Sequence, residues 1–383
     1  MAGRKTNICL NMIVKNEVKV LPRLIRSVKD YIDYYVIVDT GSSDDTIELI
    51  RREMAGYGIE GEVHERPWVN FGVNRQQALE LALAANKADW LLFIDADEEL
   101  GVSDPKFYEK LEPGMSYEIE KHQGDMRYAL RQLANVRSAN YRWEGAVHNY
   151  LTVDEEGERL CEPRKDVWII YHHGQGAKSH GVTVEEKFLR DAKVLEQELA
   201  RDPNDTRSQY YLGQSYRDAG HLERALEAYK KRASMEDGWV EEQFMAQLEV
   251  GRICVELERT EAEVLGELLG AYNLRPRRAE PLFELARYYR SKKGYAMATL
   301  FAKAGVQTPR PSDRLFIDAS VYTWRLLDEL AVATYWVGDY AMSKSACESL
   351  LEQVERGLSV PQADLERIRD NLAEAKQQLG LSE

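Results

Sequence analysis

The chain of 383 residues lacks several features that would assign it to a class at once. No apolar run approaches the ~20 residues of a membrane span, and residues 8–14 are too short for a secretory signal. No two cysteines have C-x-x-C spacing. Cysteines placed far apart in this way are typical of free thiols in a reducing compartment. These absences predict a soluble, cytoplasmic protein whose four cysteines are unlinked: Cys9, Cys161, Cys254 and Cys347.

Excess positive charge is also missing. The net charge of −14 excludes a general nucleic-acid binder and disfavours attachment to anionic lipid, since both need a basic surface. Neither G-x-G-x-x-G nor G-x-x-x-x-G-K-[ST] occurs, which counts against a dinucleotide fold and a P-loop NTPase. Hydrophobic residues make up 44% of the chain, enough for ordinary cores, and the length predicts two or three domains.

What the sequence does contain is an abrupt change at residues 90–99, where an apolar run gives way to carboxylates. The run is typical of a strand buried on both faces of a sheet. If the backbone stays extended, Asp95 and Asp97 point the same way, because side chains alternate along a strand. Such a pair suits Mg²⁺ or Mn²⁺ carrying a phosphate. The alternative is a solvated turn that opens a helix.

The first half alternates strand and helix patterns, which predicts a mostly parallel sheet covered on both faces. Ligands of such sheets bind at the carboxyl ends of the strands. Asn16–Glu17, Asp39 and Asp95-x-Asp97 follow the strands predicted at residues 8–14, at residues 34–38 and from residue 90, and they should converge there. A carboxylate accepts hydrogen bonds from a base or a ribose, or it holds a metal that holds phosphate. For Asp39 the alternative is a turn aspartate that caps the next helix.

These motifs resemble the GT-A domain of family-2 glycosyltransferases. The similarity rests on Met12-Ile13-Val14-Lys15-Asn16-Glu17, on Val38-Asp39-Thr40-Gly41-Ser42-Ser43-Asp44-Asp45-Thr46 and on Asp95-Ala96-Asp97-Glu98. Tyr141-Arg142-Trp143-Glu144-Gly145-Ala146-Val147-His148 and Tyr171-His172-His173-Gly174 resemble the branch with C-terminal tetratricopeptide repeats. The resemblance implies that a uridine is held by Asn16, Glu17 and Asp39, with Arg75 near the nucleotide. It also implies that Asp95 reaches the ribose or the metal.

For the metal, the resemblance implies Mn²⁺ or Mg²⁺ on Asp97 and on a histidine near the end of the domain. The apolar run at residues 167–171 predicts a strand, so only one of the two following histidines should face the metal, and the match favours His172. In related enzymes the next segment closes over the diphosphate, which makes Lys178 and Ser179 candidate phosphate contacts. The alternative for that segment is a plain interdomain linker.

One departure from the family pattern concerns the general base. Family members usually continue Val-His-Glu, but here the position is Asn149, which cannot take a proton. Glu144 and His148 are therefore the catalytic candidates, and Asp125 is a further carboxylate nearby. Two other readings stay open: an acceptor such as a cysteine thiol that needs little help, or weak or absent activity.

The second half predicts helical repeats. Leu212, Tyr216, Gly220, Ala225 and Tyr229 fall at the offsets of a tetratricopeptide repeat, and a second copy runs from residue 285 to 309. We therefore predict two domains: an α/β GT-A (Rossmann-like) nucleotide-sugar domain over residues 1–180 and an all-α tetratricopeptide solenoid over residues 181–383. The solenoid would present a polypeptide acceptor, or pair two copies into a homodimer.

The sequence as a whole predicts metal-dependent transfer of a sugar from a UDP-sugar to an acceptor, with inversion implied by the family. A sugar-1-phosphate nucleotidyltransferase is disfavoured, because residues 11–17 contain no glycine. Two alternatives remain: a non-catalytic repeat-containing adaptor with a relic first domain, and a transferase that acts on a saccharide.

Overall fold

The computed structural model describes residues 7–124, 126–145, 147–153, 159–161, 164–172 and 183–381. The chain divides into two compact units. The sheet unit comprises Met1–Tyr211 and Asp218–Gly220, and the repeat unit comprises Leu212–Arg217 and His221–Glu383. The boundary predicted between residues 180 and 181 lies outside the described residues.

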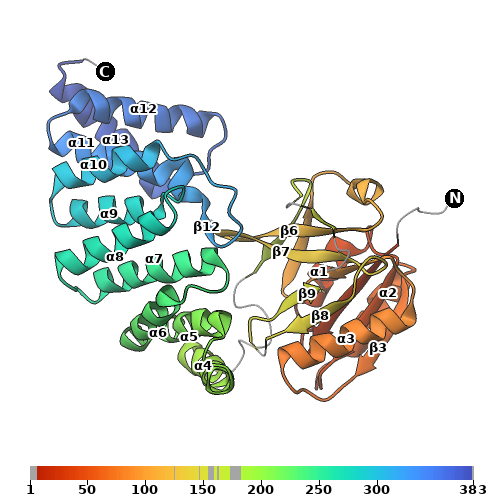
Figure 1. Ribbon diagram of the computed structural model, residues 1–383. Coiled ribbons are helices and arrows are strands. Elements are labelled where there is room, and N and C mark those ends of the chain that lie inside the picture. Colours follow the sequence, from red (N-terminus) through yellow and green to blue (C-terminus); the bar gives the residue numbers. More distant parts are fainter. Residues whose placement is uncertain are drawn as a thin grey trace. The chain divides into compact units, whose positions relative to one another are not determined.

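The sheet unit is built on one large sheet (Figure 1). Its strand order is β3-β2-β1-β4-β7-β6-β11-β5. In its first half, β3, β2, β1 and β4 run parallel, which confirms that part of the prediction. The strands of this order are β1 (Ile8–Val14), β2 (Tyr34–Asp39), β3 (Glu60–Glu65), β4 (Trp90–Phe93), β5 (Glu98–Val102), β6 (Met115–Gln123), β7 (Met126–Asn135) and β11 (Val167–Tyr171).

The other half of the sheet corrects the expectation of a mostly parallel arrangement. β7 runs antiparallel to β4 and to β6, and β5 runs antiparallel to β11. Gly124, in a left-handed conformation with φ of 58°, follows β6, and a turn of this kind reverses the chain into a hairpin. The sheet is therefore mixed, and β10 (Arg159–Cys161) pairs with β6 beside its main order.

Each face of the parallel half carries its own core. Helices α1 (Leu21–Val28) and α2 (Thr46–Gly56) pack on the face that receives Ile8 and Leu10 of β1. Helix α3 (Phe71–Ala85) packs on the opposite face, together with a separate hairpin of β8 (Tyr141–Glu144) and β9 (Tyr150–Val153). Side chains alternate along each strand, so both faces are apolar and both are covered.

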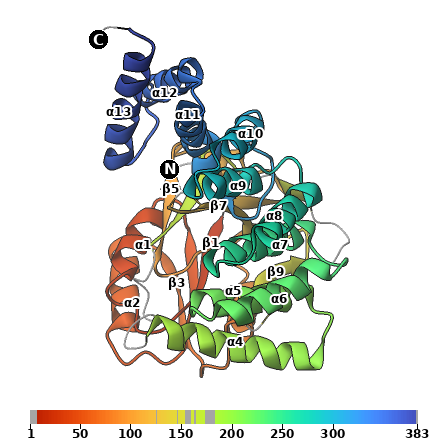
Figure 2. The ribbon, with the colours of Figure 1, turned by 90° about the vertical axis from the view of Figure 1, so that its left-hand side faces the viewer.

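The repeat unit consists mainly of paired helices that follow one another along the chain (Figure 2). Small residues let the paired helices approach: a Cβ on Gly213 would lie 2.7 Å from the Tyr229 ring, and Ala286 and Ala298 are fully buried. The tetratricopeptide prediction is confirmed, although a short strand β12 (Ile317–Asp318) and a π-helical turn η3 (Val321–Arg325) interrupt the pattern. A short 3₁₀ helix, η1 (Phe107–Lys110), belongs to the sheet unit.

The bounds of the remaining helices are α4 (Val184–Arg201), α5 (Thr206–Asp218), α6 (Leu222–Ser234), α7 (Val240–Glu256), α8 (Glu261–Leu274), α9 (Glu280–Ser291), α10 (Tyr295–Val306), α11 (Leu326–Trp336), α12 (Tyr340–Glu355) and α13 (Gln362–Gln378). In the residues that the structure describes, no helix has the length and apolarity to cross a membrane. Cys9, Cys254 and Cys347 are free and buried, as the spacing of the cysteines predicted.

Candidate active site

The carboxyl end of β2 is organised by Asp39, which is almost fully buried. Its Oδ1 accepts hydrogen bonds from the backbone N–H groups of Gly41 at 2.9 Å and Ser42 at 2.8 Å. The Ser42 hydroxyl donates to Oδ2. The turn-forming role weighed as the alternative for Asp39 is therefore present in the structure. Any ligand donor would share Oδ2 with Ser42.

The loop after β1 is tied to the loop after β2. The Asn16 N–H donates to Ser42 Oγ at 2.8 Å, and Asn16 Oδ1 accepts from the Ser43 N–H at 2.7 Å. Asn16 itself is left-handed, with φ of 57°, a conformation that asparagine tolerates better than most residues. The Glu17 N–H donates to Thr46 Oγ1 at 2.9 Å. The predicted convergence of these strand ends is found.

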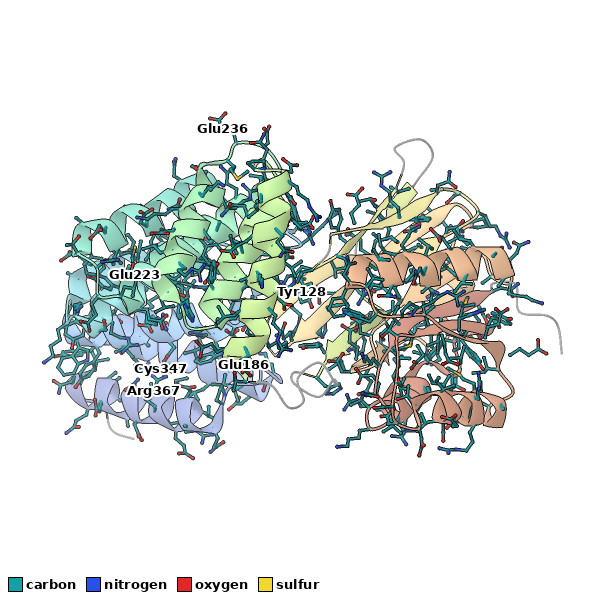
Figure 3. All side chains as sticks on the ribbon, turned by 90° about the horizontal axis from the view of Figure 1, so that it is seen from below. Tyr128, Glu186, Glu223, Glu236, Cys347 and Arg367 are labelled. Atoms are coloured by element: carbon teal, nitrogen blue, oxygen red, sulfur yellow. The ribbon has the colours of Figure 1, made fainter. Side chains whose placement is uncertain are left out.

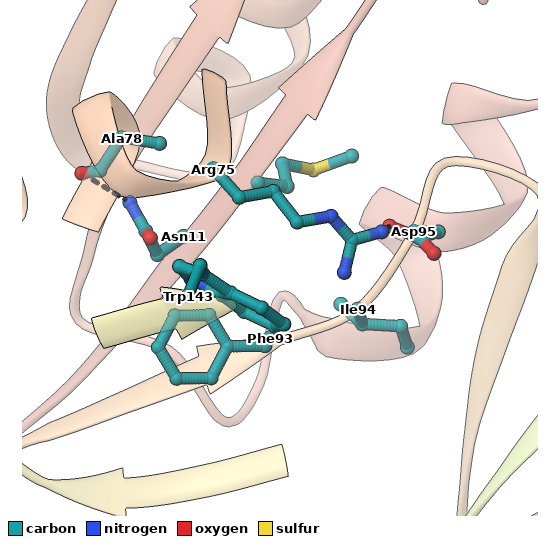
Figure 4. A pocket seen from close by; sticks show the side chains of 8 residues that line it. Asn11, Arg75, Ala78, Phe93, Ile94, Asp95 and Trp143 are labelled. Atoms are coloured by element: carbon teal, nitrogen blue, oxygen red, sulfur yellow. Dashed lines mark hydrogen bonds and ion pairs between the residues drawn. The ribbon is translucent and has the colours of Figure 1, made fainter. Parts of the chain in front are cut away.

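Arg75 of α3 reaches the end of β4. Its Nη2 lies 2.5 Å from Asp95 Oδ1, and its guanidinium lies 5.0 Å from the ring centroid of Trp143 on β8. Burial would raise the pKa of Asp95, but the charges of Arg75 and Lys121 outweigh it and hold that pKa below its usual range. These side chains border a small pocket, which Asn11 lines from β1 (Figure 4).

The backbone between Asp95 and Asp97 does not stay extended as the period-two argument assumed. Ala96 and Asp97 form a turn that leads directly into β5, not into a helix. A buried ion pair supports this turn, since Lys121 Nζ lies 2.6 Å from Glu98 Oε1. Glu98 Oε2 accepts from the Asp95 N–H at 2.9 Å, which fixes the backbone of the first aspartate.

Asp97 and His172 lie on neighbouring segments, because the His172 N–H donates to the Asp97 carbonyl at 3.3 Å. Burial and the nearby charge of Asp95 raise the pKa of Asp97. Within the described ranges, no basic side chain lies at ion-pair distance from this carboxylate. His172 Nε2 is 3.0 Å from Glu99 Oε2. Within those ranges, no three His, Cys, Asp or Glu residues are grouped to hold a metal by themselves.

Glu144 and His148 both belong to the β8–β9 hairpin. Arg142 Nε donates to Glu144 Oε1 at 2.6 Å, and the Tyr150 hydroxyl donates to Oε2 at 2.9 Å. Burial works against ionisation, but these hydrogen bonds outweigh it and lower the pKa of Glu144. Glu144 is thus a weaker base than an ordinary carboxylate. His148 is left-handed, with φ of 51°.

Three predicted residues lie outside the part of the chain that the structure describes, and two residues of the site were missed by the sequence analysis. Lys178, Ser179 and Asp125 are outside the described residues. Sequence reasoning assigned no role to Trp143, although it stands in a motif that carried the resemblance. It also missed Lys121, for which the only signal was a lysine within the alternating pattern of a strand.

A mixed sheet of this kind, with polar loops at its carboxyl edge, followed by paired helices, defines a GT-A domain joined to a tetratricopeptide solenoid. Residues 9–116 match the model of glycosyl transferase family 2.

Similar curated proteins include glycosyltransferases and a repeat protein. Glycosyltransferase SunS of Bacillus phage SPbeta is 24% identical over 58% of this chain and 52% of its own. An uncharacterized glycosyltransferase of Rickettsia felis is 33% identical over 32% of this chain and 37% of its own. A TPR repeat-containing protein of Synechococcus elongatus is 38% identical over 26% of this chain and 23% of its own. The chain thus spans about half or less of the relatives' length.

Solved structures with related helices include a tetratricopeptide repeat protein from Parabacteroides merdae. It is 16% identical and covers 51% of this chain and 68% of its own, with a TM-score of 0.37. At that score the likeness carries no argument about function, and the repeat assignment rests on the spacing of small residues and on the paired helices.

Proposed function

We propose that this protein transfers a sugar from a UDP-sugar to an acceptor, with the help of Mn²⁺ or Mg²⁺. The observation that carries the proposal is the meeting of three strand ends at one edge of the sheet. These strand ends carry Asn16, Asp39 and Asp95, and Arg75 pairs with Asp95 there. Arg75 and Asp95 also line the small pocket described above. Together these groups supply acceptors for a uracil N–H and for ribose hydroxyls.

Arg75 keeps Asp95 ionised and oriented, so that its free oxygen can accept from a ribose hydroxyl. Glu17 and Asp39 would accept from the base. A divalent ion fits beside Asp97, because burial and the charge of Asp95 raise its pKa and no basic side chain of the described residues pairs with its carboxylate. Mg²⁺ and Mn²⁺ sites of this type take one or two protein ligands and complete their shell with substrate phosphate. Asp97 and His172 would be those ligands.

When bound, the ion would offset the charge of the departing diphosphate. The chain's own part in activating the acceptor is modest, since the pKa of Glu144 is lowered and Asn149 cannot accept a proton. A single displacement on an acceptor that ionises readily needs least from such a base. A cysteine thiol, with an unperturbed pKa of about 8.5, is of that kind.

For the acceptor, we propose a polypeptide. The support is the repeat unit, because stacked helical repeats form extended surfaces of the kind that bind polypeptide. The test compares transfer of labelled sugar to cysteine- and serine-containing peptides with transfer to oligosaccharides. Modification of oligosaccharides alone would contradict the proposal.

The donor and the metal are tested together. Hydrolysis of UDP-glucose, UDP-galactose and UDP-N-acetylglucosamine is measured with Mn²⁺ and with EDTA, and UDP binding is followed by calorimetry under both conditions. We expect at least one donor to be hydrolysed, and UDP to bind about tenfold or more tightly with Mn²⁺, the effect of one charged contact. Equal affinity with EDTA would refute the metal site, and no hydrolysis of any donor would refute the function.

A further inference from the structure

The turn that joins β8 to β9 is held in an unusual backbone conformation. Gly145 and His148 both have positive φ, at 86° and 51°. A left-handed histidine is strained, so other contacts must hold it there. Those contacts come from the first turns of α5, residues 206–211, which belong to the sheet unit.

Arg207 makes most of these contacts. Its Nη2 donates to the His148 carbonyl at 3.3 Å and to the Tyr211 hydroxyl at 3.4 Å. Its guanidinium lies 4.3 Å from the ring centroid of Tyr150 and 4.9 Å from that of Tyr211. The imidazole of His148 stacks on Tyr211 with ring centroids 4.0 Å apart and an angle of 8°.

The same set of contacts extends to Glu144. Tyr150, which lies against Arg207, donates its hydroxyl to Glu144 Oε2 at 2.9 Å. Burial and the bond to Glu144 raise the pKa of Tyr150 to about 12, so this hydroxyl stays a donor at neutral pH. Both catalytic candidates of the hairpin are therefore placed, directly or through one residue, by Arg207.

We propose that Arg207 and Tyr211 are positioning residues, which hold Glu144 and His148 in place for the reaction. The inference rests on the proposed function. It assigns residues 206–211, which the sequence placed with the repeats, to the support of the β8–β9 hairpin. A chain cut at Thr183 would then lose hydrolysis of the donor as well as transfer, because the hairpin would lose its support.

The competing explanation is that Arg207 only adds stability to the fold. The two explanations differ in which step they affect. The contacts of Arg207 described above reach the hairpin and α5, whereas Asn16 and Asp39 are held by the loops after β1 and β2. A positioning residue would therefore change kcat and leave UDP binding alone.

The test compares Arg207→Ala, Arg207→Lys and wild type, using the UDP-sugar that wild type hydrolyses fastest. For Arg207→Ala we expect kcat to fall roughly ten- to a hundredfold, the scale of a small misplacement, with the Kd of UDP unchanged within about twofold. Arg207→Lys should not restore kcat, because lysine lacks the planar group that lies between two rings.

The matched control is Arg224→Ala. Arg224 makes the same kind of contact with a tyrosine, 3.9 Å from the ring centroid of Tyr216, but both residues belong to the repeat unit. It should keep the wild-type kcat. A second pair, Tyr211→Phe and Tyr211→Leu, separates the stacking ring from the hydroxyl, and only the leucine variant should lose kcat strongly.

Three results would overturn the inference. Wild-type kcat in Arg207→Ala would show that the contacts do not position anything. A parallel loss of kcat, UDP affinity and melting temperature would show a structural role only. If wild type binds no UDP and hydrolyses no donor, the proposed function fails first and the inference with it.

Discussion

Glu249 of the repeat unit and Asp97 at the edge of the sheet have pKa values that are shifted in opposite directions. In the repeat unit, Glu249 of α7 lies 2.9 Å from Arg217 on α5 and 2.8 Å from Arg252. Burial would raise the pKa of Glu249, but these two charges lower it to about 2. In the sheet unit, burial and the charge of Asp95 raise the pKa of Asp97 more than the charges of Lys121 and Lys187 lower it.

The arginine pairing recurs along the repeat unit. Each pair joins the first helices of successive repeats, with the carboxylate buried and the arginine partly exposed. The pairs are Arg252–Glu284, Arg290–Glu329 and Arg367–Asp328, the last including the arginine labelled in Figure 3. Charges that stabilise the fold are thus neutralised within the chain. A charge left without a partner at the sheet edge lowers stability and is available to a ligand.

The substitution Asp97→Asn should have the largest effect of those proposed. Loss of this carboxylate should lower donor hydrolysis about 10²- to 10³-fold and remove its dependence on Mn²⁺, as expected for an electrostatic group at the reacting diphosphate. Stability should not fall. An acid with a raised folded-state pKa destabilises the fold above that pKa, so at pH 7 the variant should melt at the wild-type temperature or higher.

The control for this substitution is Asp89→Asn, just before the amino end of β4. Asp89 pairs with Arg137 at 2.9 Å, is partly exposed and is remote from the carboxyl edge. It should keep full activity. If Asp97→Asn kept the wild-type Mn²⁺ dependence, Asp97 would not be a metal ligand, and the proposed functional difference between Asp97 and Glu249 would fail.

Glu249→Gln should give the opposite result. The pKa of Glu249 falls from its usual 4.5 to about 2, which corresponds to about 3 kcal/mol of unfolding free energy at pH 7. This contribution is present above pH 4.5 and is lost as the pH falls toward 2. Urea denaturation at several pH values should show the variant less stable at pH 7 and less sensitive to acid, with donor hydrolysis unchanged.

An exposed pair provides the comparison for Glu249. Glu352 lies 3.4 Å from Arg356, and both side chains are largely in solvent. Glu352→Gln should change stability by no more than about 0.5 kcal/mol, because exposed pairs contribute little. If both variants lost equal stability, burial would not be what distinguishes the pairs of the repeat unit.

The parallel half of the sheet was predictable because β1, β2 and β4 are apolar on both faces and the strands are separated by helices. The predicted range 8–14 coincides with β1, and 167–171 coincides with β11. The antiparallel half was not predictable, since strand direction depends on partners distant in sequence and its strands are only partly buried. β5 was missed because residues 95–99 were interpreted as a metal site at the end of a strand or, alternatively, as a turn that opens a helix.

For the site, the residue types at the strand ends could be predicted, but their mutual contacts could not. The link between Arg75 and Asp95 joins residues 20 positions apart and depends on how α3 packs. Lys121 is buried beneath the acidic turn, whereas a lysine in a sequence ordinarily indicates the surface. The support of the β8–β9 hairpin by Arg207 has no local signal at all.

The smallest expected effect concerns Asp39, whose carboxylate serves its own loop as well as the proposed ligand. Uracil offers a ring N–H that cytosine lacks, so Asp39 should favour UDP over CDP. Since Oδ2 already accepts from Ser42, the preference should be only about 1 kcal/mol, the net value of one hydrogen bond.

Calorimetry with both nucleotides should show Asp39→Asn losing this preference. Ser42→Ala, which leaves Oδ2 to the base alone, should keep or increase it. Equal binding of UDP and CDP by wild type would mean that Asp39 only organises the turn. Its partners would then all lie within the chain, as do those of the buried carboxylates of the repeat unit.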